Sequence, residues 1–149
     1  MKPPMLVGEF HHILDKEFRI ALPASLREEL GDSLQAGLYL MGGPEPCIVI
    51  YTVDRLERII ASVEADASLS KTSVREFKRE LGRTTVRVVP DAQGRIRLPE
   101  SLRAHAGIER EVTIVGTTTA IELWSTPVLN DRQAARSIVH AEIAKRVFD

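Results

Sequence analysis

The sequence contains an internal repeat, and this repeat constrains the fold more than any other feature. Segments 15–31 and 91–107 are identical at nine of seventeen aligned positions. The similarity continues downstream in the same order, pairing 38–42 with 112–116 and 48–51 with 121–124. Because self-similarity of this kind is the signature of a duplicated structural unit, we expect two halves with the same local structure.

Each half carries the same series of local signals. An aspartate opens a turn, at Asp15 and at Asp91, where its side chain can accept hydrogen bonds from backbone N–H groups two residues on. The pattern Arg-Ile-x-Leu-Pro then indicates a half-buried strand, and its proline suits the first turn of a helix. Short helices are therefore predicted at 24–30 and 100–106, each followed by a glycine typical of helix C-termini.

Helical sequence follows each half. Thr52 can cap a helix with an apolar stripe, and a second, shorter stripe is expected to end at Gly82. A further helix is expected near the C-terminus, where the sequence leaves open whether it caps the core or binds a partner. We divide the chain into a first repeat at 6–52, a helical connector at 53–82, a second repeat at 83–125 and a C-terminal helix at 126–149.

Neither half is long enough to close a core by itself, because a unit of this size leaves one face of its sheet exposed. Two copies related by a pseudo-twofold axis would share one core. We therefore expect an α+β chain, mainly β, in which both repeats build one small barrel.

The composition excludes several classes of protein. The chain has 149 residues, of which 44% are hydrophobic and 28% charged, as in a folded domain rather than a disordered or fibrous one. No apolar run reaches membrane-spanning length and the N-terminus lacks the apolar stretch of a signal peptide, so we expect a cytoplasmic protein without membrane contact. Cys47 is the only cysteine, which excludes an internal disulfide and a thiolate-rich zinc site.

The charges are unevenly distributed along the chain. The net charge of −1 argues against a general nucleic-acid binder. Segment 71–110, however, holds ten basic and five acidic residues, a local balance of +5. This excess is compatible with a local basic surface, and equally with solvated helix and strand faces, which charge alone favours.

The repeated segments also carry a more specific pattern. It consists of Gly8-Glu9-Phe10, Asp15-Lys16-Glu17-Phe18-Arg19 with Leu22-Pro23, Ile48-Val49-Ile50-Tyr51, Asp91-Ala92-Gln93-Gly94-Arg95-Ile96 with Leu98-Pro99, Val115-Gly116 and Ile121-Glu122-Leu123-Trp124. In this order, over about residues 8–124, the pattern resembles the MraZ family of bacterial transcriptional regulators. A single Asp-x-x-x-Arg would carry no information, whereas two copies with both downstream aromatic residues are specific.

The resemblance implies an AbrB-like fold, in which two repeats form a pseudo-twofold double-split β-barrel with short helices. It implies a cytoplasmic, nucleoid-associated protein that assembles into a ring-like homo-oligomer. It also implies binding to double-stranded DNA at short repeated boxes, with repression of its own operon in the division and cell-wall gene cluster. We expect neither a cofactor nor a small-molecule substrate.

Four basic residues are the candidates for DNA contact. Arg19 and Arg95 occupy equivalent positions after the two turns, and arginine both reads guanine O6 and N7 and grips phosphate. Lys16 in the first turn and Arg97 after the second are predicted to join them.

Three residues are predicted to support these turns. Asp15 and Asp91 are expected to hold the backbone and orient the arginines, and Gly94 to adopt a positive φ. The alternative is that each Asp–Arg pair is only a local surface salt bridge.

Two further features leave alternatives open. Phe18 stands where the second motif has Gly94, so either the first turn has a different shape or Phe18 takes a β-like φ with its ring packed. Arg27 and Arg103 match each other on the short helices, and either contact phosphate or pair with nearby glutamates, which are Glu28, Glu29 and Glu100.

No catalytic or metal-binding arrangement is predicted. His11 and His12 are adjacent on a predicted strand and so point to opposite faces, and neither His105 nor His140 has ligand spacing. We expect a non-enzymatic DNA-binding regulator. The alternative is a protein-interaction module, as in antitoxins of related fold, that uses the barrel and the C-terminal helix.

Overall fold

A computed structural model describes residues 2–148, and it places the helices and strands of the two repeats in the same order. The first repeat consists of β1 (Leu6–Ile13), β2 (Arg19–Ala21), α1 (Ala24–Leu30), α2 (Ser33–Ala36), β3 (Leu38–Gly42) and β4 (Ile48–Thr52), and it is followed by α3 (Val53–Ala65) and α4 (Lys71–Thr84). The second consists of β5 (Val86–Val88), β6 (Arg95–Arg97), α5 (Glu100–Ala106), β7 (Glu111–Thr118) and β8 (Ile121–Ser125), and it is followed by α6 (Thr126–Phe148). Both predicted short helices are confirmed at their expected residues.

The two repeats interlock through a six-stranded sheet with strand order β1-β7-β8-β4-β3-β5. A pseudo-twofold axis passes between β8 and β4, which are equivalent strands of the two repeats. The first strand of each repeat pairs with the other repeat, β1 with β7 and β5 with β3. Each repeat therefore completes the sheet of its partner, which explains why one repeat could not close a core alone.

The remaining two strands, β2 and β6, form a separate antiparallel ribbon, also with one strand from each repeat. Ile20 and Ile96 face each other at its centre and are almost completely buried. The backbone continues the pairing beyond the strands, because Leu22 N–H donates to the carbonyl of Gly94 and Leu98 N–H to that of Phe18, both at 2.9 Å.

The main core lies between the ribbon, the short helices and one face of the six-stranded sheet. Apolar side chains of β3, β4, β7 and β8 fill it from the sheet, and Leu26 and Leu102 fill it from α1 and α5. On the other face of the sheet, Trp124 and Leu129 belong to a second apolar cluster, in which the start of α6 packs against the sheet. Burial on both faces explains the apolar runs in β4 and β8.

The predicted α+β class is confirmed. The strands form two sheets that are not joined by pairing into a closed barrel. The expectation of a mainly β chain is wrong, since helices contain more residues than strands because α3, α4 and α6 are long.

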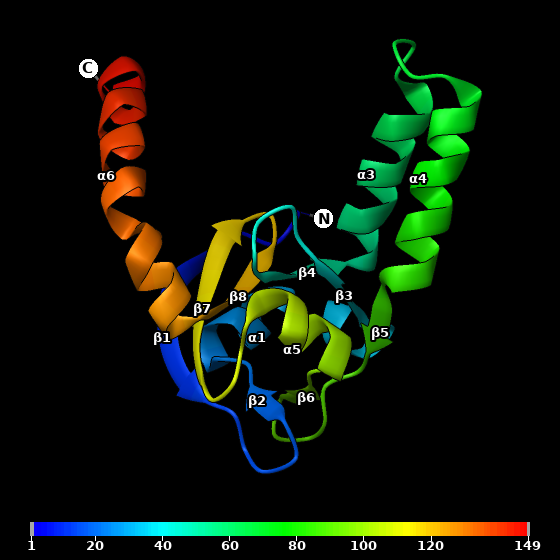
Figure 1. The fold of residues 1–149 in the computed structure, drawn as a ribbon. Coiled ribbons are helices and arrows are strands. Elements are labelled where there is room, and N and C mark those ends of the chain that lie inside the picture. The colour runs from blue at the N-terminus through cyan, green and yellow to red at the C-terminus, as the bar shows by residue number, and fades with distance from the viewer. Residues whose placement is uncertain (1, 149) are drawn as a thin grey trace.

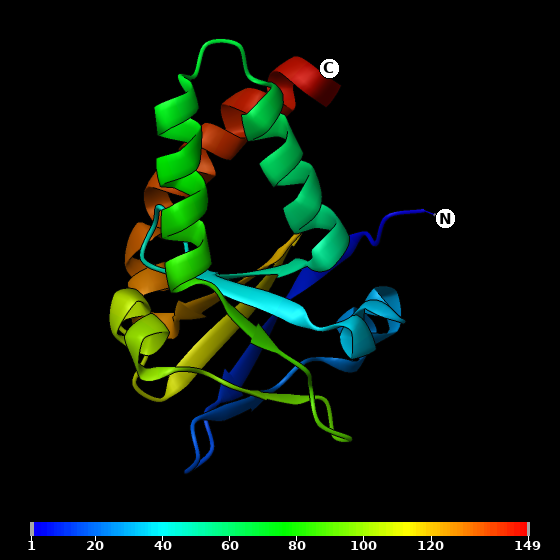
Figure 2. The ribbon, with the colours of Figure 1, turned by 90° about the vertical axis from the view of Figure 1, so that its right-hand side faces the viewer.

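The long helices lie at the opposite end of the molecule from the ribbon, with α3 and α4 on one side and α6 on the other (Figures 1 and 2). Thr52 caps α3 as predicted, accepting from the backbone N–H of Arg55. The prediction that α4 ends at Gly82 is wrong: the helix runs to Thr84, since this glycine has open space around it and costs only about 1 kcal/mol in a helix interior.

The C-terminal helix has two different parts. Its start packs on the core through Leu129, and Arg132 pairs with Glu45 at 2.9 Å. Beyond that point the helix projects from the body of the molecule (Figure 1) and carries exposed apolar side chains, which are Ile138, Val139, Ile143, Val147 and Phe148. Across residues 2–148, no helix is both long and apolar enough to cross a membrane.

Candidate nucleic-acid interface

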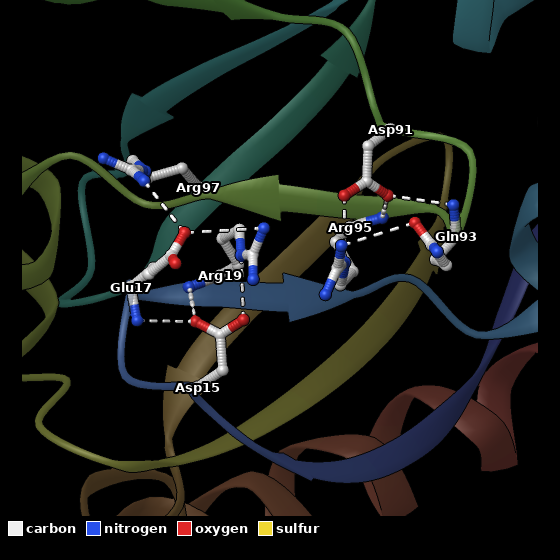
Figure 3. Close-up of polar contacts among 7 residues, drawn as sticks. All are labelled: Asp15, Glu17, Arg19, Asp91, Gln93, Arg95 and Arg97. Atoms are coloured by element: carbon white, nitrogen blue, oxygen red, sulfur yellow. Dashed lines mark hydrogen bonds and ion pairs between the residues drawn. The ribbon is translucent and has the colours of Figure 1, made fainter.

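The outer face of the ribbon is where the predicted DNA-contacting arginines gather. Arg19 pairs with Arg97 across the two strands, and Ala21 pairs with Arg95. Because side chains alternate along a strand, the burial of the central isoleucines directs these four residues to the opposite, outer face. The structure thus brings together three arginines from two segments that are distant in the sequence (Figure 3).

The first turn is held by Asp15. One carboxylate oxygen, Oδ1, accepts hydrogen bonds from the backbone N–H groups of Glu17 and Arg19, at 2.8 and 2.9 Å. The other oxygen, Oδ2, accepts from Nε of the Arg19 side chain at 2.8 Å. Phe18 N–H donates to the Asp15 carbonyl and closes the turn.

The second turn repeats this arrangement around Asp91. Its Oδ1 accepts from the backbone N–H groups of Gln93 and Arg95, both at 2.9 Å, and its Oδ2 accepts from Arg95 Nε at 2.9 Å. In each turn one aspartate thus fixes both the backbone and the direction of its arginine, and the Asp–Arg salt bridge is part of that arrangement. One terminal nitrogen of each guanidinium group contacts a further side chain, Glu17 for Arg19 and Gln93 for Arg95 (Figure 3).

These hydrogen bonds favour the charged forms of Asp15, Asp91 and Arg19. The pKa of Asp15 is lowered, chiefly by the backbone N–H of Arg19 and further by the Arg19 side chain. The pKa of Asp91 is lowered in the same way by Arg95. The pKa of Arg19 is raised, first by its hydrogen bond to Asp15 and further by the charges of Asp15 and Glu17. The turns therefore keep their ion pairs over the whole physiological pH range.

The shape of the Phe18 turn differs from both expectations. Phe18 adopts φ of 61°, close to the 75° of Gly94, so the first turn has the same shape as the second and Phe18 is not β-like. Phe18 is 43% exposed, and the guanidinium carbon of Arg103 lies 3.7 Å from the centroid of its ring. A cation–π contact of this kind offsets part of the cost of a positive φ.

Within residues 2–148, Arg27 and Arg103 do not pair with the nearby glutamates, and each instead donates to a backbone carbonyl; their contact with phosphate stays a prediction. Arg27 Nε donates to the carbonyl of Leu22, and Arg103 Nε donates to that of Leu98, both at 3.0 Å. Each arginine also lies against the turn of the other repeat. Arg103 covers Phe18, and Arg27 lies so close to Gly94 that a Cβ there would come within 2.4 Å of its Cδ.

Sequence reasoning missed one charged residue of this face, Glu17. Its Oε2 lies 3.5 Å from Nη1 of Arg19 and 3.4 Å from Nη2 of Arg97. The equivalent Gln93 accepts from Nη2 of Arg95 at 3.3 Å. Alignment of the two repeats gives the Glu17/Gln93 difference directly, but not the contact with Arg97, which arises only from strand pairing.

The ribbon and its turns carry four candidate cations and three carboxylates. The cations are Arg19, Arg95, Arg97 and the exposed Lys16 at the first turn, and the carboxylates are Asp15, Glu17 and Asp91. The excess of positive charge on one copy is therefore small, which limits the attraction to phosphate that a single copy can provide.

The other candidate residues have ordinary structural surroundings. His11 lies 3.2 Å from the hydroxyl of Thr113 and forms an ion pair with Glu9 when protonated. Cys47 is buried in the second apolar cluster. Over residues 2–148, no group of three or more His, Cys, Asp or Glu side chains is arranged to hold a metal ion.

Comparison with known proteins identifies the repeat. The sequence model of the family described as "MraZ protein, putative antitoxin-like" matches the chain twice, at residues 5–80 and 82–148. The chain belongs to the MraZ family. The two matches cover both repeats together with the long helices that follow them.

Individual members of the MraZ family are similar to this chain in sequence over most of its length. A protein of Thermobifida fusca named transcriptional regulator MraZ is 33% identical over 97% of both chains. A protein of the same name from Paenarthrobacter aurescens is 39% identical over 89% of this chain and 92% of its own. A third, from Micrococcus luteus, is 34% identical over 97% of this chain and the whole of its own.

Proposed function

We propose that this member of the MraZ family is a sequence-specific DNA-binding transcriptional regulator that reads DNA with the outer face of the β2–β6 ribbon. The observation that carries this proposal is the set of three arginines on one face of a two-stranded antiparallel ribbon. A ribbon of this kind fits the major groove of B-DNA, where arginine reads guanine through two hydrogen bonds. The naming of the relatives as transcriptional regulators supports the same function.

The residues divide into two roles in this proposal. Arg19 and Arg95 contact base edges, because an aspartate holds the Nε of each and thereby fixes the direction of its guanidinium group. Arg97 and the exposed Lys16 contact phosphate or bases beside them. Asp15, Asp91 and Gly94 position the turns.

The protein acts as a ring-like homo-oligomer in this proposal. One ribbon has few cations in excess, so several copies on one DNA molecule are needed for tight binding, and linked sites gain affinity through effective concentration. A ring presents its ribbons at regular intervals and therefore favours short repeated boxes. The exposed apolar residues of α6 supply a surface for contact between copies.

The proposed setting is the one that the resemblance to the MraZ family implies. The regulator acts in the cytoplasm on the nucleoid and represses its own operon in the division and cell-wall gene cluster. DNA binding of this kind requires no cofactor and no small-molecule substrate, and we assign the chain no enzymatic activity.

A second candidate function is a protein-interaction module of the antitoxin type. The observation that favours it is the exposed apolar side of α6, together with the antitoxin-like description of the family. Salt dependence distinguishes the two functions. Binding through arginine–phosphate contacts weakens steeply between about 50 and 200 mM salt, whereas an apolar helix interface does not.

The experiment is a fluorescence anisotropy titration of a labelled duplex from immediately upstream of the gene, with a shuffled duplex of equal length as the control. We expect tighter binding to the native duplex. Arg95→Ala should cost about 1–3 kcal/mol of specific binding free energy, as for one bidentate base contact, whereas Lys16→Ala should weaken both duplexes alike.

Two results would contradict this proposal in different ways. Equal, weak binding to both duplexes would favour the protein-interaction module. A larger loss of specific binding in Lys16→Ala than in Arg95→Ala would show that base readout is assigned to the wrong residue.

A further inference from the structure

The carboxylate of Glu17 lies between two arginines of the DNA-facing ribbon (Figure 3). A single oxygen, Oε2, is 3.5 Å from Arg19 and 3.4 Å from Arg97, which come from different repeats. The charge of Arg19 is therefore shared between Asp15 and Glu17, whereas among the described residues Arg95 contacts one carboxylate, that of Asp91, and the neutral Gln93.

The second turn provides an internal reference for this carboxylate. Gln93 occupies the equivalent position, and its amide oxygen contacts Arg95 at 3.3 Å. Because both turns have the same backbone hydrogen bonds and a positive φ at the next residue, Glu17 and Gln93 occupy equivalent backbone positions and differ in the charge of their side chains. A change between Glu and Gln at either position therefore alters the charge and leaves the turn unchanged.

Stability does not account for this carboxylate. Glu17 is 58% exposed and Arg97 66% exposed, and ion pairs between exposed groups contribute little to folding. Such contacts also exchange readily for contacts with another ligand. The position of Glu17 on the ribbon's outer side instead places its charge where a DNA duplex would lie.

A carboxylate at this place affects two kinds of DNA contact differently. Binding to arbitrary sequence depends on phosphate, which repels a carboxylate and competes with it for the arginines. In the major groove, a carboxylate can accept a hydrogen bond from the amino group of cytosine. The carboxylate therefore lowers the affinity most for DNA that contacts the ribbon through phosphate without contacts to bases.

We propose that Glu17 is a specificity-determining residue, which holds Arg19 and Arg97 in place on the ribbon and penalises binding to DNA that offers only phosphate. This inference rests on the proposed function, since it assumes that the ribbon faces DNA. Glu17 thereby lowers non-specific affinity without lowering specific affinity to the same extent, and the ratio of the two affinities rises.

The test compares Glu17→Gln with the reciprocal variant Gln93→Glu in the same anisotropy titrations of native and shuffled duplexes. Glu57→Gln, on the exposed side of α3 far from the ribbon, makes the same change of net charge and is the control. We expect Glu17→Gln to bind the shuffled duplex about two- to fivefold more tightly, the scale of one exposed ion pair. The salt slope for that duplex should steepen by about one.

The affinity of Glu17→Gln for the native duplex should rise less, so its preference for that duplex falls. Gln93→Glu should weaken binding to the shuffled duplex, and Glu57→Gln should match the unmodified protein. Because the main result is a gain of affinity, loss of folding cannot produce it.

The possible failures are distinguishable. If the unmodified protein prefers the native duplex but Glu17→Gln changes both affinities equally, or no more than Glu57→Gln does, the inference is overturned and the proposed function stands. If the unmodified protein shows no preference for the native duplex, the proposed function fails and the inference fails with it.

Discussion

The turn at Asp15 and the turn at Asp91 have the same backbone hydrogen bonds, although only the aspartate and the arginine are common to their five residues. The three residues between them differ in charge and size, with Lys-Glu-Phe in one turn and Ala-Gln-Gly in the other. The comparison shows that one carboxylate, accepting from two backbone N–H groups and one side chain, is sufficient to define the turn. The intervening positions are then available to change how each turn meets its ligand.

The third intervening residue shows how the two turns tolerate different side chains. Gly94 has no side chain, and Arg27 lies directly against it. Phe18 adopts a similar φ and places its ring beneath Arg103, the equivalent arginine. A left-handed conformation costs about 1–2 kcal/mol for a residue with a side chain, and a cation–π contact returns about 0.5–1 kcal/mol at an exposed site.

The largest effect is expected where the two halves of the ribbon are alike. Ile20→Ala and Ile96→Ala should each lower the free energy of unfolding by about 2–5 kcal/mol, because both side chains are buried at the centre of the ribbon. Chemical denaturation should give similar losses for both. If the loss in one variant is less than about half the loss in the other, the two strands do not contribute equally to the core.

A smaller loss is expected for Gly94→Ala. The new Cβ would take a positive φ, at a cost of about 1–2 kcal/mol, and would displace Arg27 from its place against the turn. Gly107→Ala is the matched control, because Gly107 also has a positive φ but has open space around it. Thermal unfolding should show a greater loss for Gly94→Ala; equal losses would mean that Arg27 moves aside without cost.

At Phe18 the usual order of alanine and glycine should be reversed. Phe18→Ala keeps the cost of the positive φ and loses the contact with Arg103, whereas Phe18→Gly loses the contact but also removes that cost. The glycine variant should therefore be more stable than the alanine variant by about 1 kcal/mol in thermal unfolding. Greater stability of the alanine variant would indicate that the turn changes shape when the ring is removed.

The smallest effect is a loss of stability in acid, which begins only as the pH falls below the ordinary aspartate pKa. The pKa values of Asp15 and Asp91 are lowered in the folded protein, so their ionised forms stabilise it fully above the ordinary aspartate pKa of about 3.9. This contribution is lost as the pH falls through their lowered values. Stability measured between pH 5 and pH 2 should fall less in the Asp15→Asn/Asp91→Asn variant than in the unmodified protein. An equal fall in both would assign the acid sensitivity to other carboxylates.

Much of the fold and part of the candidate site could be predicted from the sequence because their signals are local. The repeated Asp-x-x-x-Arg and Leu-Pro patterns predicted two turns, two short strands and two short helices. The shape of the Phe18 turn could not be predicted in this way, since propensity disfavours a positive φ and the compensating Arg103 lies in the other repeat. The places of Arg27, Arg103 and Glu17 were missed for the same reason, because their partners are distant in the chain.

The sequence by itself determined that the molecule is built from two copies of one unit and that each copy presents an arginine after an aspartate-defined turn. These features depend on interactions between residues a few positions apart, which a sequence pattern records. Only the tertiary structure decided that the first strand of each repeat joins the other repeat's sheet, and that β2 and β6 pair into one ribbon. That pairing sets Arg97 opposite Arg19 and beside Glu17. It buries apolar surface that neither repeat can cover alone, and this shared burial brings the candidate DNA-contacting residues of both onto one face.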